Sequence, residues 1–171
     1  MTTPFDIPRT AAMLVCAGAV ATITAVFVFQ YGLGYQPCQL CYYQRLPYYV
    51  GIPLALIAAG LPRAQARARA IALGLLALVF LVSAGLAIHH AGVEWKWWAG
   101  PAGCAAAADQ SGSIDDFMKQ LNSVRVVSCT DAAWRFLGLS MAGWNAVVSL
   151  ILAAIAFLGA RRPAAVRGLP R

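Results

Sequence analysis

Long stretches without a charged residue divide the chain into four apolar segments. Residues 10–44, 46–62, 70–93 and 136–160 contain no Asp, Glu, Lys or Arg. A helix that crosses a bilayer needs about 20 mainly apolar residues. The pattern therefore predicts four transmembrane helices, at about 10–31, 43–62, 70–90 and 138–160. Two longer loops, 32–42 and 91–137, then lie together at one end of the helical bundle.

The composition supports a membrane-embedded fold. The chain of 171 residues is 61% hydrophobic and only 11% charged, whereas soluble domains have roughly 25% charged residues. A water-soluble globule of this size could not bury so much apolar surface. We therefore expect one all-α integral membrane domain over residues 1–171. The first apolar segment resembles a signal peptide, but it exceeds the usual core of about 7–15 residues, so we interpret it as a retained helix.

The distribution of basic residues predicts the orientation. The net charge is +7, but the basic residues are scattered at segment ends, which favours membrane lipid over nucleic acid as the partner. Segments 1–9, 62–69 and 161–171 hold eight of them, and the opposite end, 32–45 and 91–135, holds five together with five acids. Because positive loops stay inside, both termini are expected in the cytoplasm. The two longer loops then face outward, into the periplasm if the cell is a Gram-negative bacterium.

Four of the five cysteines fall in the two outward loops. Cys38 and Cys41 lie in the first loop and Cys104 and Cys129 in the second, whereas Cys16 lies within the first helix, where we interpret it as a small packing residue. An oxidising compartment favours disulfides, and four cysteines allow three pairings.

The motif Pro37-Cys38-Gln39-Leu40-Cys41 is the sharpest chemical signal in the chain. Cysteines two residues apart form a small ring that exchanges readily with other thiols. Cys41 is expected in the first turn of a helix, and Arg45, four residues on, is expected to stabilise its thiolate. A zinc site and a purely structural disulfide are the alternatives for the pair, and Arg45 could instead reach a lipid phosphate.

The second loop contains a short amphipathic pattern. Its apolar positions follow helical spacing: Ile114, Phe117, Met118, Leu121 and Val124. Such a helix either lies on the membrane surface or packs as a cap on the loop. A Cys104–Cys129 disulfide could serve merely as a staple for this loop.

Together these features resemble the disulfide bond formation protein B (DsbB) family. The resemblance depends on four helices in order, on Pro37-Cys38-x-x-Cys41-x-x-x-Arg45 after the first, on the cysteine pair in the long second loop, and on Phe136-Leu137-Gly138-Leu139-Ser140-Met141 before the last. The vitamin K epoxide reductase family also uses four helices and loop cysteines, but its C-x-x-C motif lies near the last helix. The early position here favours DsbB.

The resemblance implies a thiol:quinone oxidoreductase. A soluble thioredoxin-fold oxidase of the DsbA type would form a mixed disulfide with Cys104. Cys129 would then attack Cys38, and Cys41 would pass electrons to a quinone, either ubiquinone or menaquinone, beside Arg45. The sequence also lacks a glycine-rich nucleotide fingerprint. No metal is expected as part of this chemistry.

Two histidines end the third predicted helix on the outward side. The resemblance favours His90 over His89 as a quinone contact, and Glu94 could assist proton transfer. An interfacial role in the head-group region is the alternative for both histidines, and an aromatic belt accounts for the nearby tryptophans. The competing function is a non-catalytic scaffold or transporter whose loop disulfides only brace it. A transporter would need buried polar groups, for which Thr22, Thr24, Ser83, Asn145 and Ser149 are weak candidates.

Overall fold

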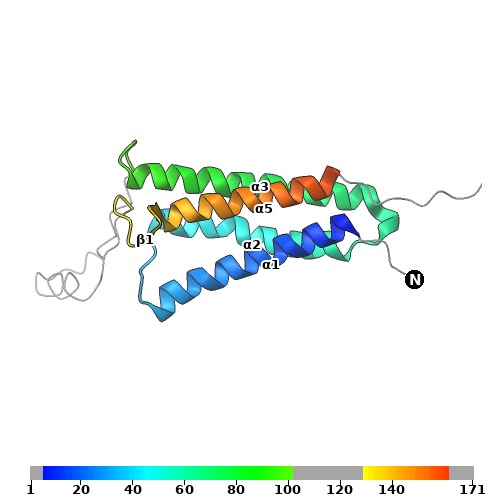
Figure 1. The fold of residues 1–171 in the computed structure, drawn as a ribbon, viewed down its shortest axis with the longest axis horizontal. Coiled ribbons are helices and arrows are strands. Elements are labelled where there is room, and N and C mark those ends of the chain that lie inside the picture. The colour runs from blue at the N-terminus through cyan, green and yellow to red at the C-terminus, as the bar shows by residue number, and fades with distance from the viewer. Residues whose placement is uncertain (1–5, 102–128, 162–171) are drawn as a thin grey trace, which may run out of the picture.

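The computed structural model describes residues 6–101 and 129–161, and four long helices lie side by side in this part of the chain (Figure 1). They are α1 (Ile7–Phe27), α2 (Gln39–Gly60), α3 (Ala66–Glu94) and α5 (Met141–Arg161). Shorter elements join them: the π-helical turn η1 (Val28–Gly32), the 3₁₀ turn η2 (Arg63–Gln65), and strands β1 (Arg135–Phe136) and β2 (Leu139–Ser140). Cys104 and the predicted amphipathic helix at 114–124 lie outside the described residues.

Three stretches are long and apolar enough to cross a membrane. They are Ile7–Gly32, Arg63–Glu94 and Met141–Arg161. Helix α2 has the necessary length, but Gln44, Arg45 and several tyrosines make its first half more polar. Large apolar side chains also cover the outside of the bundle, among them Met13, Leu56, Leu75, Leu78, Val82 and Ile151. A monomeric soluble protein rarely exposes so continuous an apolar surface, so the outer surface fits a lipid environment.

Helix α2 begins at Gln39, before the expected start near residue 43. Cys38 occupies the N-cap position with an extended backbone, and its sulfur accepts a hydrogen bond from the Cys41 backbone N–H at 3.3 Å. The cap satisfies one of the free amides that every helix start exposes. The cysteine motif therefore lies at the helix start rather than in a separate loop.

A tight hairpin precedes α5, which begins at Met141 rather than at 138. Strands β1 and β2 are antiparallel, with Phe136 opposite Leu139. Leu137 and Gly138 between them have positive φ angles of 51° and 82°. Two successive positive φ angles are the mark of the type I′ turn, whose twist matches a two-stranded ribbon. Part of the segment expected to begin the last helix therefore forms this turn instead.

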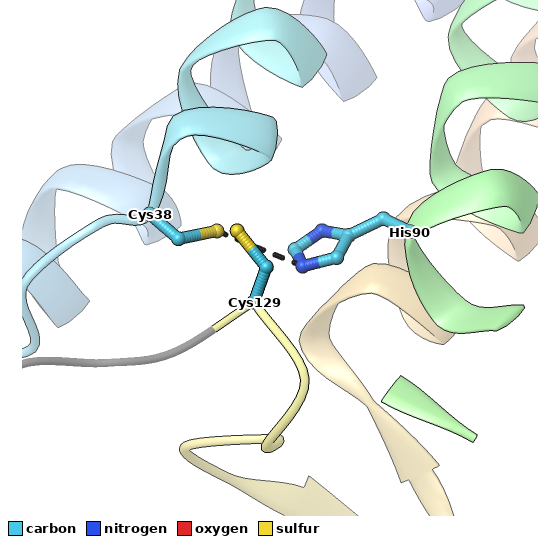
Figure 2. A group of neighbouring side chains, drawn as sticks. All are labelled: Cys38, His90 and Cys129. Carbon is cyan, nitrogen blue, oxygen red and sulfur yellow. Dashed lines mark hydrogen bonds between the residues drawn. The ribbon is translucent and has the colours of Figure 1, made fainter. Parts of the chain in front are cut away.

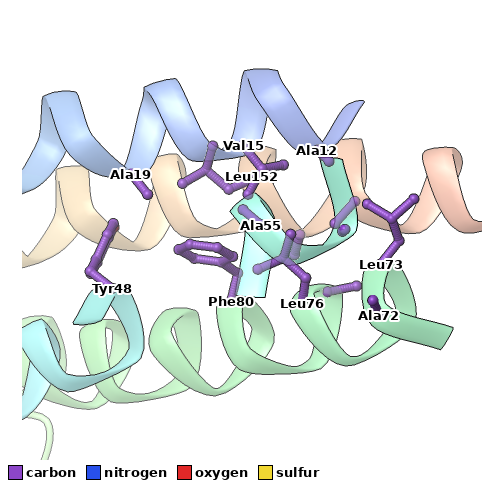
Figure 3. Close-up of a cluster of buried hydrophobic side chains, with 14 of the residues drawn as sticks. Ala12, Val15, Ala19, Tyr48, Ala55, Ala72, Leu73, Leu76, Phe80 and Leu152 are labelled. Carbon is purple, nitrogen blue, oxygen red and sulfur yellow. The ribbon is translucent and has the colours of Figure 1, made fainter. Parts of the chain in front are cut away.

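The core of the bundle consists largely of small side chains and a few large ones (Figure 3). Tyr48 and Phe80 are fully buried and meet edge to face, with ring centroids 5.4 Å apart. Gly159 lets α5 approach α1 closely, since a Cβ atom there would lie 2.6 Å from the Ala11 Cβ. Such close contacts between small residues are typical of helices that associate in membranes.

Asp6 joins three elements at the end of the bundle where α1 begins. Its carboxylate caps α1 through the Arg9 N–H and accepts hydrogen bonds from Arg69 at 2.9 Å and Arg63 at 3.0 Å. Burial works against its charge, but the hydrogen bonds from these arginines outweigh burial and lower the pKa of Asp6. The ion pairs fix the start of α1 against η2 and α3.

At the other end of the bundle, α1 leans away from the remaining helices (Figure 1). A cavity of about 410 Å³ lies there, between the last turns of α1, the first half of α2 and the start of α5. Cys38 and Cys41 of the cysteine motif line this cavity. The fold thus brings Cys38 and Cys41 next to a cavity that could admit a ligand.

Candidate redox site

The two cysteines of the motif lie in contact at the start of α2. Their sulfurs are 2.8 Å apart, and both residues carry free thiols. A disulfide has an S–S length of about 2.05 Å, so the pair needs only a small movement to close. The helix start thus presents a dithiol that is arranged for oxidation.

Cys129 brings a second redox group to the same place. It is disulfide-bonded, and because Cys16, Cys38 and Cys41 are free, its partner lies outside the described residues. Figure 2 shows the Cys129 sulfur turned toward that of Cys38, with His90 beside them. The reactive atoms of these three side chains all lie within 4.8 Å of one another, and all three are buried. A disulfide sulfur and a free thiol therefore face each other across two separate segments of the chain.

The surroundings of Cys38 favour its thiolate. The Cys41 thiol hydrogen-bonds the Cys38 sulfur, and with His90 it lowers the pKa of Cys38 to about 4, although burial acts in the opposite direction. An ordinary cysteine has a pKa near 8.5. The N-cap position adds the positive end of the helix dipole. The sequence led us to expect Cys41 in the first turn of the helix, carrying the stabilised thiolate. Cys41 does lie in the first turn, but Cys38 occupies the N-cap position and contacts His90, and these contacts favour the thiolate at Cys38.

His90 connects Cys38 to the interior of the bundle. Its Nε2 lies 3.6 Å from the Cys38 sulfur, and its Nδ1 lies 2.6 Å from the Gln44 side-chain amide. Glu94, one turn further along α3, approaches the same Nε2 at 3.9 Å. His89 instead stacks on Trp98, with ring centroids 5.7 Å apart. Of the two histidines, His90 is therefore the one that lies in the site.

Arg45 lies buried beside the C-terminal end of α1, in the wall of the cavity. It is only 7% exposed, and it donates a hydrogen bond of 2.7 Å to the Gln30 side-chain oxygen. Its guanidinium carbon lies 5.0 Å from the Tyr42 ring centroid and 5.8 Å from that of Phe27. The Nε atom has no hydrogen-bond partner in the described part of the chain. Its charge acts on the Cys41 sulfur at longer range, so Arg45 lies near the sulfur yet keeps donor capacity for a further group.

The cavity beside these residues is mostly apolar. Its lining includes Cys38, Cys41, Arg45, His90 and Glu94. Aromatic rings cover the side toward the hairpin: Phe29 contacts Trp134, which stacks on Phe136, and the Trp144 indole N–H bonds the Phe136 carbonyl oxygen at 3.1 Å. An apolar space with a few polar groups directed into it is typical of small-molecule sites. Its chemistry suits a flat, apolar ring with polar edges.

The cluster of Cys38, His90 and Cys129 also has the composition of a metal site. Zinc binds thiolate and imidazole ligands, but it requires both sulfurs as thiolates. Cys129 is already committed to a disulfide. The disulfide-bonded state of Cys129 therefore argues against a zinc site in this cluster.

Several polar residues of the site carry no recognisable sequence signal. Gln30 and Gln44 were not expected in the site, whereas Asn145 and Ser149 were considered only as weak candidates for the buried polar groups of a transporter. In the fold, Gln44, Tyr48 and Asn145 form a continuous buried chain of hydrogen bonds that leads to His90. Cys16 packs against the apolar core, away from this site. Only the isolated polar positions in apolar segments hinted at the chain of hydrogen bonds.

Comparison with known proteins identifies the family. The model of the family described as disulfide bond formation protein DsbB matches residues 8–159, and the chain belongs to this family. A protein named disulfide bond formation protein B from Marinobacter nauticus is 31% identical over 158 residues, covering 87% of this chain and 88% of its own. A relative of the same name from Polaromonas sp. is 30% identical and covers 92% of this chain and 92% of its own. Another, from Shewanella sp. strain MR-4, is 30% identical and covers 94% of this chain and 95% of its own. No solved structure matches the chain significantly.

The family assignment confirms the resemblance inferred from the sequence. It establishes a membrane protein of disulfide bond formation with an all-helical bundle and three candidate spans. The roles of the individual residues, the electron acceptor and the thiol partner remain for the proposal below.

Proposed function

We propose that this protein is a thiol:quinone oxidoreductase of the bacterial inner membrane. It would re-oxidise a periplasmic thioredoxin-fold dithiol oxidase of the DsbA type and pass the electrons to a membrane quinone. The observation that carries the proposal is the contact between two redox groups: the disulfide-bonded Cys129 lies against Cys38, whose neighbour Cys41 opens into the cavity. A loop disulfide that served only as a brace would not need a second, free thiol pair beside it.

The thiol half of the reaction is a series of exchanges. A partner thiolate attacks Cys104, breaks its bond to Cys129 and releases the Cys129 thiolate. That thiolate attacks Cys38, breaks the Cys38–Cys41 disulfide and releases the Cys41 thiolate. The second partner thiol then breaks the mixed disulfide, and the Cys104 thiolate attacks Cys129 to release Cys38. The partner has become a disulfide, and the two electrons rest on Cys38 and Cys41.

The low pKa of Cys38 suits these steps. A thiol of low pKa is a good leaving group, so the bridge between Cys38 and Cys129 breaks readily on the Cys38 side. The same thiolate would form the bond to Cys41 when a bound quinone, the oxidant of this step, takes up the two electrons of the dithiol. His90 stabilises the Cys38 sulfur in both roles through its Nε2.

The residues at the cavity fit a quinone. Arg45 has an unused Nε donor, Glu94 has a buried oxygen without a partner among the described residues, and the remaining walls are largely aromatic or aliphatic. When bound, a quinone supplies a two-electron acceptor that takes up two protons. Arg45 would donate to its polar edge, His90 would line the wall of the cavity beside it, and the aromatic rings of the hairpin would exclude water from the thiols. The net reaction moves two electrons and two protons from the partner dithiol to the quinone.

The arrangement of the helices supports a four-span topology. From Tyr48 onward, helix α2 packs in the same core as α1 and α3, and its 22 residues reach across a bilayer. The start of α1 and the end of α5 lie at the same end of the bundle, opposite the hairpin (Figure 1). With the basic residues concentrated at that end, we place it in the cytoplasm and the cysteines in the periplasm.

Turnover by purified protein tests this function. The protein in detergent is given a reduced DsbA-type oxidase and a soluble quinone analogue, and quinone reduction is followed by absorbance. We expect turnover in the wild type, no turnover in Cys38→Ser, and unchanged turnover in Cys16→Ser. Wild-type protein without turnover, or Cys38→Ser with full turnover, would instead favour a scaffold with structural disulfides.

A further inference from the structure

A buried chain of hydrogen bonds leads from the cysteine pair into the bundle. The Cys38 sulfur contacts His90 Nε2 at 3.6 Å, and His90 Nδ1 lies 2.6 Å from the Gln44 Nε2. The Gln44 Oε1 accepts from the Asn145 amide at 2.6 Å, and the Asn145 Oδ1 accepts from the Tyr48 hydroxyl at 2.5 Å. Four residues from α2, α3 and α5 thus continue the contact that begins at the reactive sulfur.

The direction of this chain determines where His90 carries its proton. A side-chain amide has a donor end and an acceptor end. The Tyr48 hydroxyl donates to the Asn145 oxygen, so the Asn145 nitrogen faces Gln44 and the Gln44 nitrogen faces His90. His90 Nδ1 must then accept, and a neutral imidazole with an accepting Nδ1 carries its proton on Nε2. That proton is directed at Cys38.

We propose that Gln44 and Asn145 are positioning residues that hold His90 in the Nε2–H tautomer, so that His90 donates to the Cys38 thiolate. The role of His90 in thiol exchange rests on the proposed function. The arrangement in which Gln44 and Asn145 fix the His90 tautomer, here called the clamp, is a property of the free protein. The amides orient His90 without conducting protons, because neither Gln nor Asn titrates. In the same way, a hydrogen bond to one imidazole nitrogen fixes which nitrogen serves a bound metal.

The position of the chain argues for a specific purpose. Gln44 is only 7% exposed and His90 only 3% exposed. Buried polar groups are costly unless they are hydrogen-bonded, so each member of the chain is held in place by its immediate partners. Here Ser149 and Ser83 complete the chain behind Tyr48, with hydrogen bonds of 3.1 and 2.9 Å.

Other ionisable groups also influence Cys38, and the test must separate them from the clamp. Those around Cys38 or lining the same cavity are Tyr35, Cys41, Arg45, Tyr48, His90, Glu94, Cys129 and Asp131. All of these side chains are still present when only Gln44 is substituted. A change in Cys38 reactivity that follows Gln44 therefore reports on His90.

The test compares Gln44→Met with Gln44→Glu in reduced, detergent-purified protein. Alkylation of Cys38 by iodoacetamide is measured by mass spectrometry between pH 4 and 9. Gln44→Met cannot donate to Nδ1, and we expect Cys38 alkylation at pH 6 to fall at least tenfold. In Gln44→Glu a carboxylate oxygen faces Nδ1 and can only accept, so it places the proton of the neutral ring on Nδ1 and leaves Nε2 without one. The Cys38 rate at pH 6 should therefore fall as it does in Gln44→Met. Ser83→Ala is the matched control, since it disturbs the far end of the chain and should leave the profile unchanged.

A second readout observes the tautomer directly. The ¹⁵N shifts of His90, assigned with the aid of His89→Gln, should show a protonated Nε2 in the wild type. A protonated Nδ1 in the neutral ring would overturn the proposal. So would a Gln44→Met alkylation profile that matches the wild type, or an equal fall in the Cys38 alkylation rate in Gln44→Met and Ser83→Ala. Neither measurement involves quinone or partner, so a failed clamp leaves the turnover result standing, and absent turnover leaves the clamp standing.

Discussion

His90 Nε2 lies 3.6 Å from the Cys38 sulfur and turns its other nitrogen to Gln44. Both ring nitrogens therefore already have partners within the protein. The sequence led us to expect His90 as a quinone contact, and the geometry gives it a further role at the thiol. The histidine joins the exchange site and the cavity, because it lines the cavity as well.

The first prediction concerns the pH dependence of the reduced pair. Because the pKa of Cys38 is lowered to about 4, its thiolate persists above that pH and is lost only as the pH falls through it. The stabilisation of the reduced protein by this thiolate is thus fully present above about pH 8.5, the ordinary thiol value, and declines toward pH 4. In His90→Gln we expect slower Cys38 alkylation at pH 6, by about tenfold, as measured by peptide mass spectrometry. An unaltered rate in that variant would remove His90 from the stabilisation of Cys38.

The second prediction concerns the contact between the two redox groups. In Cys41→Ser the Cys38 thiolate has lost its near partner, and the Cys129 sulfur lies beside it. We expect Cys38 to attack the Cys129 disulfide, form a Cys38–Cys129 bridge and release the former partner of Cys129. The cross-linked peptide should appear by mass spectrometry without reducing agent.

Two variants support that experiment. Adding Cys16→Ser to Cys41→Ser should leave the bridge in place, because Cys16 packs in the core. Adding Cys38→Ser should remove it. If Cys41→Ser instead kept a freely alkylated Cys38 and its original disulfide, the exchange between the two loops would have no support.

The third prediction concerns Arg45 and the quinone. Arg45→Ala removes the charge and the unused Nε donor at the cavity, so we expect the apparent quinone affinity to fall about tenfold or more, equal to about 1.4 kcal/mol. Thiol exchange with the reduced partner should change little, because Arg45 makes no hydrogen bond to Cys38 within the described residues. Arg67→Ala, an exposed arginine of α3, is the control. Quinone titrations at saturating partner separate the two effects, and an unchanged KM for quinone in Arg45→Ala would place its charge outside the quinone site.

Much of this fold could be anticipated because bilayer helices leave a strong pattern in the sequence. The charge-free segments located α1, α3 and α5 to within a few residues, since every side of such a helix must be apolar. The hairpin before α5 escaped the same reasoning. Leu137 and Gly138 adopt positive φ angles within an apolar run, where hydrophobicity alone does not distinguish a turn from a helix.

The candidate site was only partly visible in the sequence for a different reason. Cysteine spacing identifies a redox pair because two sulfurs must come within bonding distance. The partners of His90 and Arg45 are neutral amides, Gln44 and Gln30, which have no spacing rule and come from helices that meet only in the fold. The preference for Cys38 over Cys41 likewise depends on which residue caps α2.

The fourth prediction concerns the ion pairs at the opposite end. Asp6→Asn removes the charged hydrogen-bond acceptor of Arg69, whose side chain is only 3% exposed. We expect a loss of about 2 kcal/mol in stability near neutral pH. Since the pKa of Asp6 is lowered, wild-type stability from this group is present above its unfolded pKa and is lost as the pH falls through the folded value. Thermal unfolding in detergent at pH 7 and pH 3 should therefore show a smaller difference between variant and wild type in acid, and a constant difference would contradict the ion-pair explanation.

The fifth prediction concerns the close contact of α1 with α5. In Gly159→Ala the new Cβ would lie 2.6 Å from the Ala11 Cβ, and both atoms are fixed to helix backbones, so the helices must separate. We expect a loss of about 1–3 kcal/mol, measured by thermal unfolding in detergent. Gly85→Ala is the matched control, because nothing lies within 4 Å of its Cβ position and Ala favours the helix. The double variant Ala11→Gly, Gly159→Ala should recover much of the loss, since it removes the opposing Cβ. If the double variant were as unstable as Gly159→Ala alone, the cause would lie elsewhere than in this contact.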